Sequence, residues 1–212
     1  MSINITHNPS TVGEYSTNAL GIGTYHLADH PNLYEIQRTN NFEFIIDADK
    51  INSLTKLGSN TSFGTGEDSP ADIIRISVES FPIPYFHQRA ITIRRGNNQL
   101  KYAGIPEFDN ASLVLKDFIG VETADILVAW QARSYNVLTE KVGLVEDYKM
   151  NCTVIEYSPD YQVVRAWDLK GCWISNLRQD DMSNENNNAV KITATIEFDS
   201  CRPNTNFKAD DQ

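Results

Sequence analysis

The feature that most constrains the fold is the stretch at residues 189–199, where apolar and polar side chains alternate almost without a break. Successive side chains of a strand point to opposite faces, so this pattern predicts one strand with an apolar and a polar face. The apolar face holds Val190, Ile192, Ala194, Ile196 and Phe198. The polar face holds Lys191, Thr193, Thr195, Glu197 and Asp199. At eleven residues the predicted strand exceeds the usual length of about five or six. Such a strand needs a packed core on one side only, so its function depends on what meets the polar side.

Turn residues divide much of the remaining chain into further β-rich runs. Gly96, Asn97 and Asn98 tolerate positive φ and predict a hairpin around them. The motif at residues 158–160 predicts a second turn, and Gly171 predicts a bend. The predicted strands before the closing run are residues 42–46, 74–79, 91–95, 99–102, 111–116, 151–157, 162–169 and 172–177.

Only one segment, residues 123–134, has a convincing helical pattern. We expect Thr123 to be its N-cap, and Ile126, Leu127 and Trp130 to share its buried face. One helix cannot form a bundle, so we expect it to pack against the side of a β-sheet. The residues therefore predict a mainly β fold with one flanking helix.

Three segments fall outside this regular pattern. Residues 1–40 show little periodicity and are expected to form an N-terminal arm or extension of a β domain at residues 41–201. Within that domain, residues 47–72 are expected to form a long loop, because the stretch 58–70 is rich in turn-forming residues. Loops longer than about 12–15 residues are usually functional or disordered. Residues 202–212 are expected to be a loose C-terminal tail.

The charge distribution is acidic and uneven. The chain has 18 Lys and Arg against 28 Asp and Glu, which argues against binding nucleic acid through its phosphates. Residues 73–120 hold 6 basic and 4 acidic side chains, whereas the segments on either side are acidic. One interpretation is that copies of the chain attract each other head to tail. The alternative is scattered, solvated surface charge without such a role.

The sequence has no recognisable catalytic or cofactor-binding motif. No G-x-S-x-G or H-E-x-x-H occurs, and the carboxylates have no convergent partner. His26 and His30 have a spacing that could hold a metal on a helix, but Pro31 argues against a helix there. We therefore expect no enzyme activity, no catalytic residues, no cofactor and no metal site.

The cysteines and the hydropathy further restrict which class of protein the chain can belong to. Cys152, Cys172 and Cys201 contain no CxxC pair, and the first two are expected to be buried reduced thiols. No run approaches 18 apolar residues, so we expect no insertion into a membrane.

Several sequence features between residues 41 and 201 indicate a protein family when their order along the chain is considered. They are Trp130 in the helix, Val142–Gly143, Asp147–Lys149, the turn at Pro159–Asp160, the run Leu169–Ser175, and the closing strand that ends in Phe198–Asp199. In this order they resemble the tail tube and tube-initiator proteins of contractile-tailed bacteriophages, a family related in fold to the tube protein of type VI secretion. Residues 1–40 and 47–72 are longer than a minimal tube subunit requires.

The resemblance implies a small β-barrel, or two packed antiparallel sheets, flanked by one helix. It implies a structural virion protein whose six copies form a ring and whose rings stack into a tube for genome ejection. Implied partners are copies of the chain, a tape measure protein, and the tail sheath and baseplate proteins, while DNA passes through without specific binding. The implied location is the virion tail, after assembly in the host cytoplasm. The alternatives are a tube-initiator or baseplate-proximal ring protein and, from another class, a β-sandwich binding module.

Two groups of residues are candidates for contacts in such an assembly. We expect the polar face of the closing strand to meet the lumen or a neighbouring subunit, with a solvated sheet face as the alternative; its residues are Lys191, Thr193, Thr195 and Glu197. We expect the long loop to reach a neighbouring ring or subunit and to bury Leu57 or Phe63 there. The alternative is an ordinary surface loop.

Overall fold

The computed structural model describes residues 36–58, 62–64, 69–182 and 188–204. The chain divides into two compact units, Met1–Arg38 and Thr39–Gln212, and the described helices and strands all belong to the second. The predictions for residues 1–35, including the histidine pair, lie outside the described residues, as does the tail from residue 205. None of the described helices has the length and apolar character that crossing a membrane requires.

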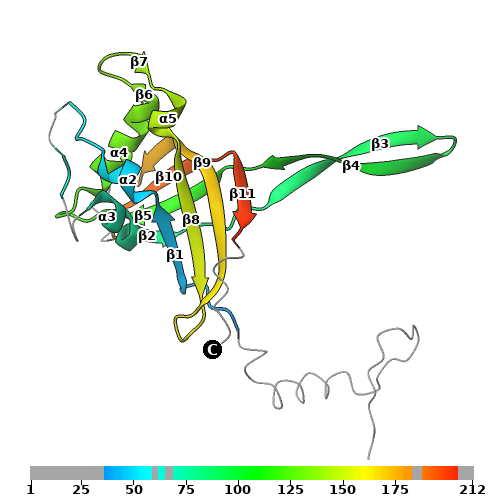
Figure 1. Cartoon of the computed structure of the whole chain (residues 1–212), viewed down its shortest axis with the longest axis horizontal. Helices are drawn as coiled ribbons and strands as arrows, with labels where there is room; N and C mark the ends of the chain where they lie inside the picture. Colours follow the sequence, from blue (N-terminus) through cyan, green and yellow to red (C-terminus); the bar gives the residue numbers. More distant parts are fainter. Residues whose placement is uncertain (1–35, 59–61, 65–68, 183–187, 205–212) are drawn as a thin grey trace, which may run out of the picture. The chain divides into compact units, whose positions relative to one another are not determined.

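The described part of the chain is dominated by one curled, antiparallel sheet of seven strands. Its path is β1-β8-β9-β10-β5-β2, and β11 also pairs with β9. The strands are β1 (Phe42–Ile46), β8 (Met150–Tyr157), β9 (Val163–Gln179), β10 (Lys191–Glu197), β5 (Ala111–Lys116), β2 (Val78–Ser80) and β11 (Ser200–Pro203). Figure 1 shows the sheet curling into a half-barrel, with β1 and β2 at the ends of the path. The predicted mainly β fold is confirmed.

Strand β9 joins two strands that the sequence pattern separates. The predicted strands at residues 162–169 and 172–177 form one continuous strand of 17 residues. Gly171 bends it with a φ of 71°, a left-handed value that glycine adopts without the steric cost of a Cβ. As far as Cys172 the strand pairs with β8, and beyond the bend it pairs with β10. The bend is confirmed, and the break between two strands is wrong.

Four helices are described where the sequence pattern predicts one. They are α2 (Ala48–Asn52), α3 (Pro70–Ser77), α4 (Thr123–Ser134) and α5 (Val145–Tyr148). Helices α2, α3 and α4 bury side chains such as Ile51, Ile74 and Leu127 in one core with the apolar face of the sheet. Two of the added helices have only five and four residues. A helix that short completes little more than one turn, so its periodicity cannot be recognised.

The prediction of a strand at residues 74–79 is wrong, because most of this segment belongs to α3. The side chain of Ser69 caps the helix by accepting a hydrogen bond from the backbone N–H of Asp72 at 3.4 Å, and a proline occupies the first turn. The alternation of isoleucines favoured a strand. In the structure Ile76 is 71% exposed and the other isoleucines of α3 are buried, as one face of a helix requires.

Helix α4 is confirmed with the predicted bounds, and it is the longest described helix. Its buried face includes the three predicted side chains, Ile126, Leu127 and Trp130. The predicted cap is wrong, because Glu122 holds the N-cap position with a left-handed φ of 52°. The hydroxyl of Thr123 lies instead 3.2 Å from that of Ser77 in α3, so it joins two helices.

The closing strand is confirmed as β10, although its seven residues fall short of the eleven predicted. The side chains of its predicted apolar face, Ile192, Ala194 and Ile196, are at most 4% exposed. The chain turns at Asp199, whose N–H donates to the carbonyl of Lys170 at 2.9 Å, and continues as β11. Strand β11 includes residues 202 and 203 of the expected tail.

One long and one short hairpin complete the described part of the fold. The pair β3 (Phe86–Arg95) and β4 (Asn98–Phe108) confirms the predicted hairpin and extends it at both ends. The pair β6 (Tyr135–Asn136) and β7 (Lys141–Val142) follows α4 directly. In Figure 1 the first of these hairpins runs away from the main sheet.

Candidate assembly surfaces

Within the described residues, the β3–β4 hairpin contacts the core at its base alone. The ring of Phe108 packs edge-on against that of Phe198, with centroids 5.9 Å apart. Further out, the register of the two strands shifts between Gln88 and Ala90. At this irregularity a Cβ on Gly104 would lie 2.2 Å from the carbonyl oxygen of Arg89, so the close approach of the two backbones requires glycine. The base therefore holds the hairpin in place while its outer half extends from the sheet.

The outer half of the hairpin has one apolar and one polar face, because residues directly opposite in a ladder share a face. Ile91 lies opposite Tyr102, and Ile93 lies opposite Leu100. These four residues make the apolar face. The polar face includes Thr92 opposite Lys101 and Arg94 opposite Gln99.

Neither face is covered within the described part of the chain, where all residues from 86 to 103 are exposed. The four apolar side chains are 42–54% exposed. Completing their burial would stabilise by roughly 1 kcal/mol each, about half the value for a fully exposed side chain. An isolated two-stranded hairpin is at best marginally stable in water, and a contiguous apolar patch of this kind marks a contact surface. The hairpin therefore has the properties of one side of an interface.

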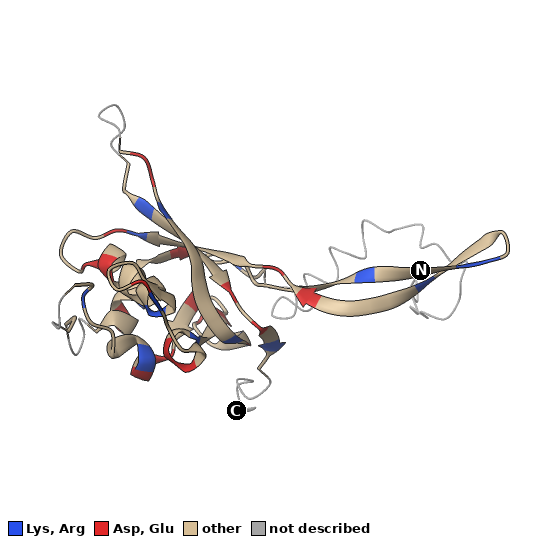
Figure 2. Cartoon of the chain, turned by 90° about the horizontal axis from the view of Figure 1, so that it is seen from above, with Lys and Arg blue, Asp and Glu red and all other residues tan. Residues whose placement is uncertain are grey.

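The hairpin is also basic. Four cationic residues, Arg89, Arg94, Arg95 and Lys101, accompany the single acidic residue Glu107. Figure 2 shows the basic residues along the outer part and acidic residues at the base. Among the described residues, the three outermost cations have no ion-pair partner, whereas Glu107 lies 3.3 Å from His87 and 3.5 Å from Arg89. A partner surface with acidic groups would complement the tip.

The four candidate residues of β10 lie together on the polar face, in the middle of the sheet. All four are partly buried. The Nζ of Lys191 donates to Oε1 of Glu79 in β2 at 2.8 Å, and this hydrogen bond chiefly raises the pKa of Lys191 and lowers that of Glu79. The carboxylate of Glu197 accepts a hydrogen bond from Ser175 at 3.3 Å.

The neighbours of the two threonines add one cation, two uncharged polar side chains and one valine to this face. Thr193 lies between Arg178 and Val114, and Thr195 lies between Asn176 and Ser112 on the adjacent strands. The structure thus brings the candidate residues into one polar surface. Their contact with a lumen or with another subunit stays a prediction.

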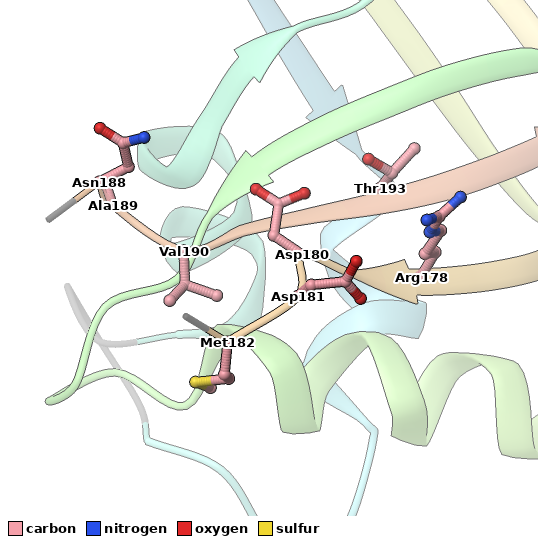
Figure 3. A pocket seen from close by; sticks show the side chains of 8 residues that line it. All are labelled: Arg178, Asp180, Asp181, Met182, Asn188, Ala189, Val190 and Thr193. Atoms are coloured by element: carbon pink, nitrogen blue, oxygen red, sulfur yellow. The ribbon is translucent and has the colours of Figure 1, made fainter. Parts of the chain in front are cut away.

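A pocket of about 660 Å³ opens where β9 ends and β10 begins. Figure 3 shows the eight residues that line it, which are Arg178, Asp180, Asp181, Met182, Asn188, Ala189, Val190 and Thr193. Thr193 is the candidate residue of β10 that reaches it. The lining is mostly polar and of mixed charge, unlike the mainly apolar enclosure typical of small-molecule sites. This pocket extends the polar face of the sheet.

The two candidate residues of the long loop have different environments. Phe63 is only 5% exposed and belongs to the core of its own chain, with Lys56 5.8 Å from the centre of its ring. Its burial therefore does not depend on a neighbouring ring. Leu57 is exposed and lines two cavities beside α4, where it is available for contact.

These two cavities adjoin each other along α4, and we call them together the α4 groove. Their volumes are about 300 and 360 Å³, and both are lined by Leu57 and Ala132. The exposed apolar side chains that line the groove are Leu57, Val128, Tyr135, Val137 and Leu138. Sequence reasoning missed this surface, because Val137 and Leu138 lie in a turn without periodicity.

Two observations concern the titratable and sulfur-containing groups of the described residues. Among the described residues, no group of three His, Cys, Asp or Glu side chains could hold a metal ion. Cys152 and Cys172 are buried as predicted, and burial raises the pKa of the Cys152 thiol well above its ordinary value. A protonated, buried thiol is a poor nucleophile. The surfaces described above are therefore the better candidates for function.

The curled antiparallel sheet, flanked by α4 and carrying a long hairpin, is a tail-tube-like fold. A chain in the cryo-EM structure of the anti-feeding prophage cap, described as the tube-terminating cap, matches with a TM-score of 0.53 and 15% identity over 80% of this chain and 91% of that chain. A chain in the sheath/tube terminator of the extracellular contractile injection system PVC, in its extended state, matches with a TM-score of 0.53 and 15% identity over 81% and 98%.

A third similar structure is the PVC sheath-tube complex in the extended state, matched with a TM-score of 0.53 and 14% identity over 84% of this chain and 96% of that chain. No family model matches the chain, and no curated protein matches its sequence. The similarity to these structures therefore lies in the fold. It confirms the resemblance to tail tube proteins at that level.

Proposed function

We propose that this chain is a non-enzymatic structural subunit of a tail-like tube, assembled from many copies of itself. The observation that carries the proposal is the β3–β4 hairpin, whose apolar face no described residue of the same copy covers. The tail-tube-like fold supports the same function. A surface of this kind is disfavoured in a monomer and stable in an assembly.

The proposed assembly is a ring, of six copies by resemblance, that stacks into a tube. The half-barrel supports this because its edge strands β1 and β2 each pair with one described strand, and ring closure would remove such edges. A head-to-tail interface closes into a ring or repeats along a filament, depending on its rotation. In this arrangement we propose that residues 41–201 form the tube domain and residues 1–40 an extension.

The proposed role is a channel for genome ejection in the tail of a virion, built in the host cytoplasm. A tape measure protein would lie in the channel, and sheath and baseplate proteins would contact the outside and the end of the tube. One similar structure is described as a sheath-tube complex, which supports a sheath partner. We propose that the polar face of β10 meets the lumen or the next subunit, and that DNA passes without specific binding.

A second candidate function is a protein that forms a single ring at one end of the tube. Two of the similar structures favour it, because one is described as a tube-terminating cap and the other as a sheath/tube terminator. The tube-initiator or baseplate-proximal ring is the corresponding role at the other end. A terminal ring and a tube subunit share the fold and differ in whether stacking continues.

Electron microscopy of the purified chain separates these functions. Long hollow tubes are expected for a tube subunit, and single rings for a terminal ring protein. A monomer at every concentration would contradict both and favour a binding module.

A double variant tests whether the hairpin carries assembly. Replacing Ile91 and Ile93 by Ser removes two apolar side chains worth roughly 1 kcal/mol each at the contact, so the concentration needed for assembly should rise about 30-fold. The control is Thr92→Ser, on the opposite face of the same strand. Light scattering against concentration measures both. Equal curves for the double variant and the control would refute the role of the hairpin.

A further inference from the structure

We propose that the β3–β4 hairpin of one copy docks into the α4 groove of a second copy. The inference rests on the proposed self-assembly and adds the surface that receives the hairpin. The hairpin is the donor because no described residue covers its apolar face. The groove is the acceptor because it is concave and because the cavity beside Val128, Tyr135 and Val137 is mainly apolar. Both surfaces belong to the same chain, so a single interface would repeat from copy to copy.

The two surfaces match in apolar character. Along the groove, Val128 of α4 is followed by Tyr135 in β6 and Val137 in the next turn, all exposed. On the hairpin, Ile93 and Leu100 lie opposite each other and are the apolar pair nearest to the turn. Contact would bury apolar area on both sides, the main favourable contribution in protein association.

The charges around the two surfaces are in part opposite. Two cations line the groove, but Lys56 is paired with Glu122 at 2.6 Å and Arg133 donates to the carbonyl of Ser53 at 3.0 Å. The hairpin tip carries Arg94, Arg95 and Lys101. Acidic side chains near the groove are Glu140, in the turn between β6 and β7, and Glu146 and Asp147 in α5. These three acidic residues are exposed and have no ion-pair partner among the described residues. Complementary charges of this kind select a partner and fix its orientation.

The edge of β9 favours a strand as the occupant of the groove. The ladder between β8 and β9 reaches Cys172, whereas the ladder between β10 and β9 continues to Gln179. Between these points Trp173, Ile174 and Ser175 line one of the two cavities. Their backbone has a described strand partner on the β10 side only. An extended hairpin can use such an edge by strand addition, which a helix cannot do.

The contact has to join two copies. Figure 1 shows the hairpin and the end of the unit that carries α4, α5, β6 and β7 on opposite sides of the main sheet. The outer strand segment from Ala90 to Arg95 reaches roughly 20 Å beyond the register shift at about 3.3 Å per residue. A donor on one side and an acceptor on the other produce a head-to-tail interface.

Cross-linking between two different variants tests this pairing directly. One variant carries Ile93→Cys and the other Val137→Cys, both with Cys201→Ser to remove the partly exposed native thiol. Mixed and treated with the mild oxidant diamide, they should give a disulfide-linked dimer that contains one copy of each. The matched control replaces Val137→Cys by Gln162→Cys, an exposed position at the turn between β8 and β9. Cross-linking of Ile93→Cys to the control as efficiently as to the groove variant would overturn the inference.

A substitution in the groove provides the second test. Val137→Lys adds a cation where the basic tip would dock, so the concentration needed for assembly should rise at least 10-fold. The control is Val164→Lys, at an exposed position of β9 away from the groove. It should leave the concentration needed for assembly unchanged. If the hairpin variant prevents assembly and Val137→Lys does not, the acceptor is wrong while the proposed function stands. If neither changes assembly, both the proposed role of the hairpin and the inference fail.

Discussion

The bend in β9 provides a stability prediction whose magnitude follows from the structure. We expect Gly171→Ala to lower the free energy of unfolding by roughly 1–3 kcal/mol. The first contribution is conformational, because Gly171 has a φ of 71° and a left-handed conformation costs a residue with a Cβ roughly 1–2 kcal/mol.

The second contribution comes from a contact on the exposed side of the bend. A Cβ at position 171 would lie 2.2 Å from Oδ2 of Asp199, so that side chain has to move. The carboxylate currently accepts from Nζ of Lys149 at 2.7 and 2.8 Å. Because Asp199 is 62% exposed, losing this ion pair should cost only roughly 0.2–1 kcal/mol. The conformational contribution is therefore expected to dominate.

Urea unfolding followed by tryptophan fluorescence, at concentrations where the chain is monomeric, measures the effect. In an Asp199→Ala background the cost of Gly171→Ala should fall by roughly 0.2–1 kcal/mol, because the contact with Asp199 is already absent. Gly120→Ala is the control, since a Cβ there meets nothing within 4 Å, and it should stay within about 0.5 kcal/mol of the parent. If Gly171→Ala is as mild as Gly120→Ala, the argument from the left-handed bend is refuted.

Two further predictions concern titratable groups. The pKa of Tyr157 is raised to about 12, chiefly by burial and then by the hydrogen bond that its hydroxyl donates to Glu43 at 2.6 Å. The unfolded chain therefore loses the phenolic proton at a lower pH than the folded chain. Stability from Tyr157 is complete below about pH 10 and is lost as pH rises toward 12, so urea midpoints should fall more steeply there in the parent than in Tyr157→Phe. The second prediction concerns the cysteines: partial burial raises the pKa of Cys201 to about 11, whereas Cys152 and Cys172 are buried. At pH 8 a thiol reagent should therefore label Cys201 slowly and the other two thiols only after unfolding. Rapid labelling of all three would contradict the packing of this sheet.

Sequence reasoning succeeded where a pattern was long enough to be unambiguous. The closing strand places four of its five predicted apolar residues in the core, all except Val190, and α4 places its three there. The hairpin around Gly96 and Asn97 was also predicted, because the turn residues and the flanking alternation agree. In each case local chemistry and burial favour the same structure.

It failed where a short segment fits two periodicities. Residues 74–79 alternate like a strand, yet the cap at Ser69 and the burial of Ile73 and Ile74 make most of the segment a helix. The break expected at Gly171 was wrong because a glycine bends a paired strand as readily as it ends one. Helices α2 and α5 were missed because each is too short to show a helical period in its sequence.

The candidate surfaces were predicted unevenly for a physical reason. The polar side chains of β10 were identified because alternation alone assigns them to one face. The α4 groove combines Leu57, Val128 and Val137 from three separate segments, and no local pattern connects them.

By itself, the sequence determined that the chain is mainly β, that β10 has one buried and one polar face, and that a hairpin turns at Gly96–Asn97. These properties depend on side-chain chemistry at adjacent positions. Only the tertiary structure decided that Phe63 belongs to the core and that the other described residues leave the apolar face of the hairpin uncovered. Alternation shows that two faces differ, but whether the apolar face has a partner depends on where distant strands and helices lie. That partner is absent from the described part of a single copy, and this is why the structure points to assembly.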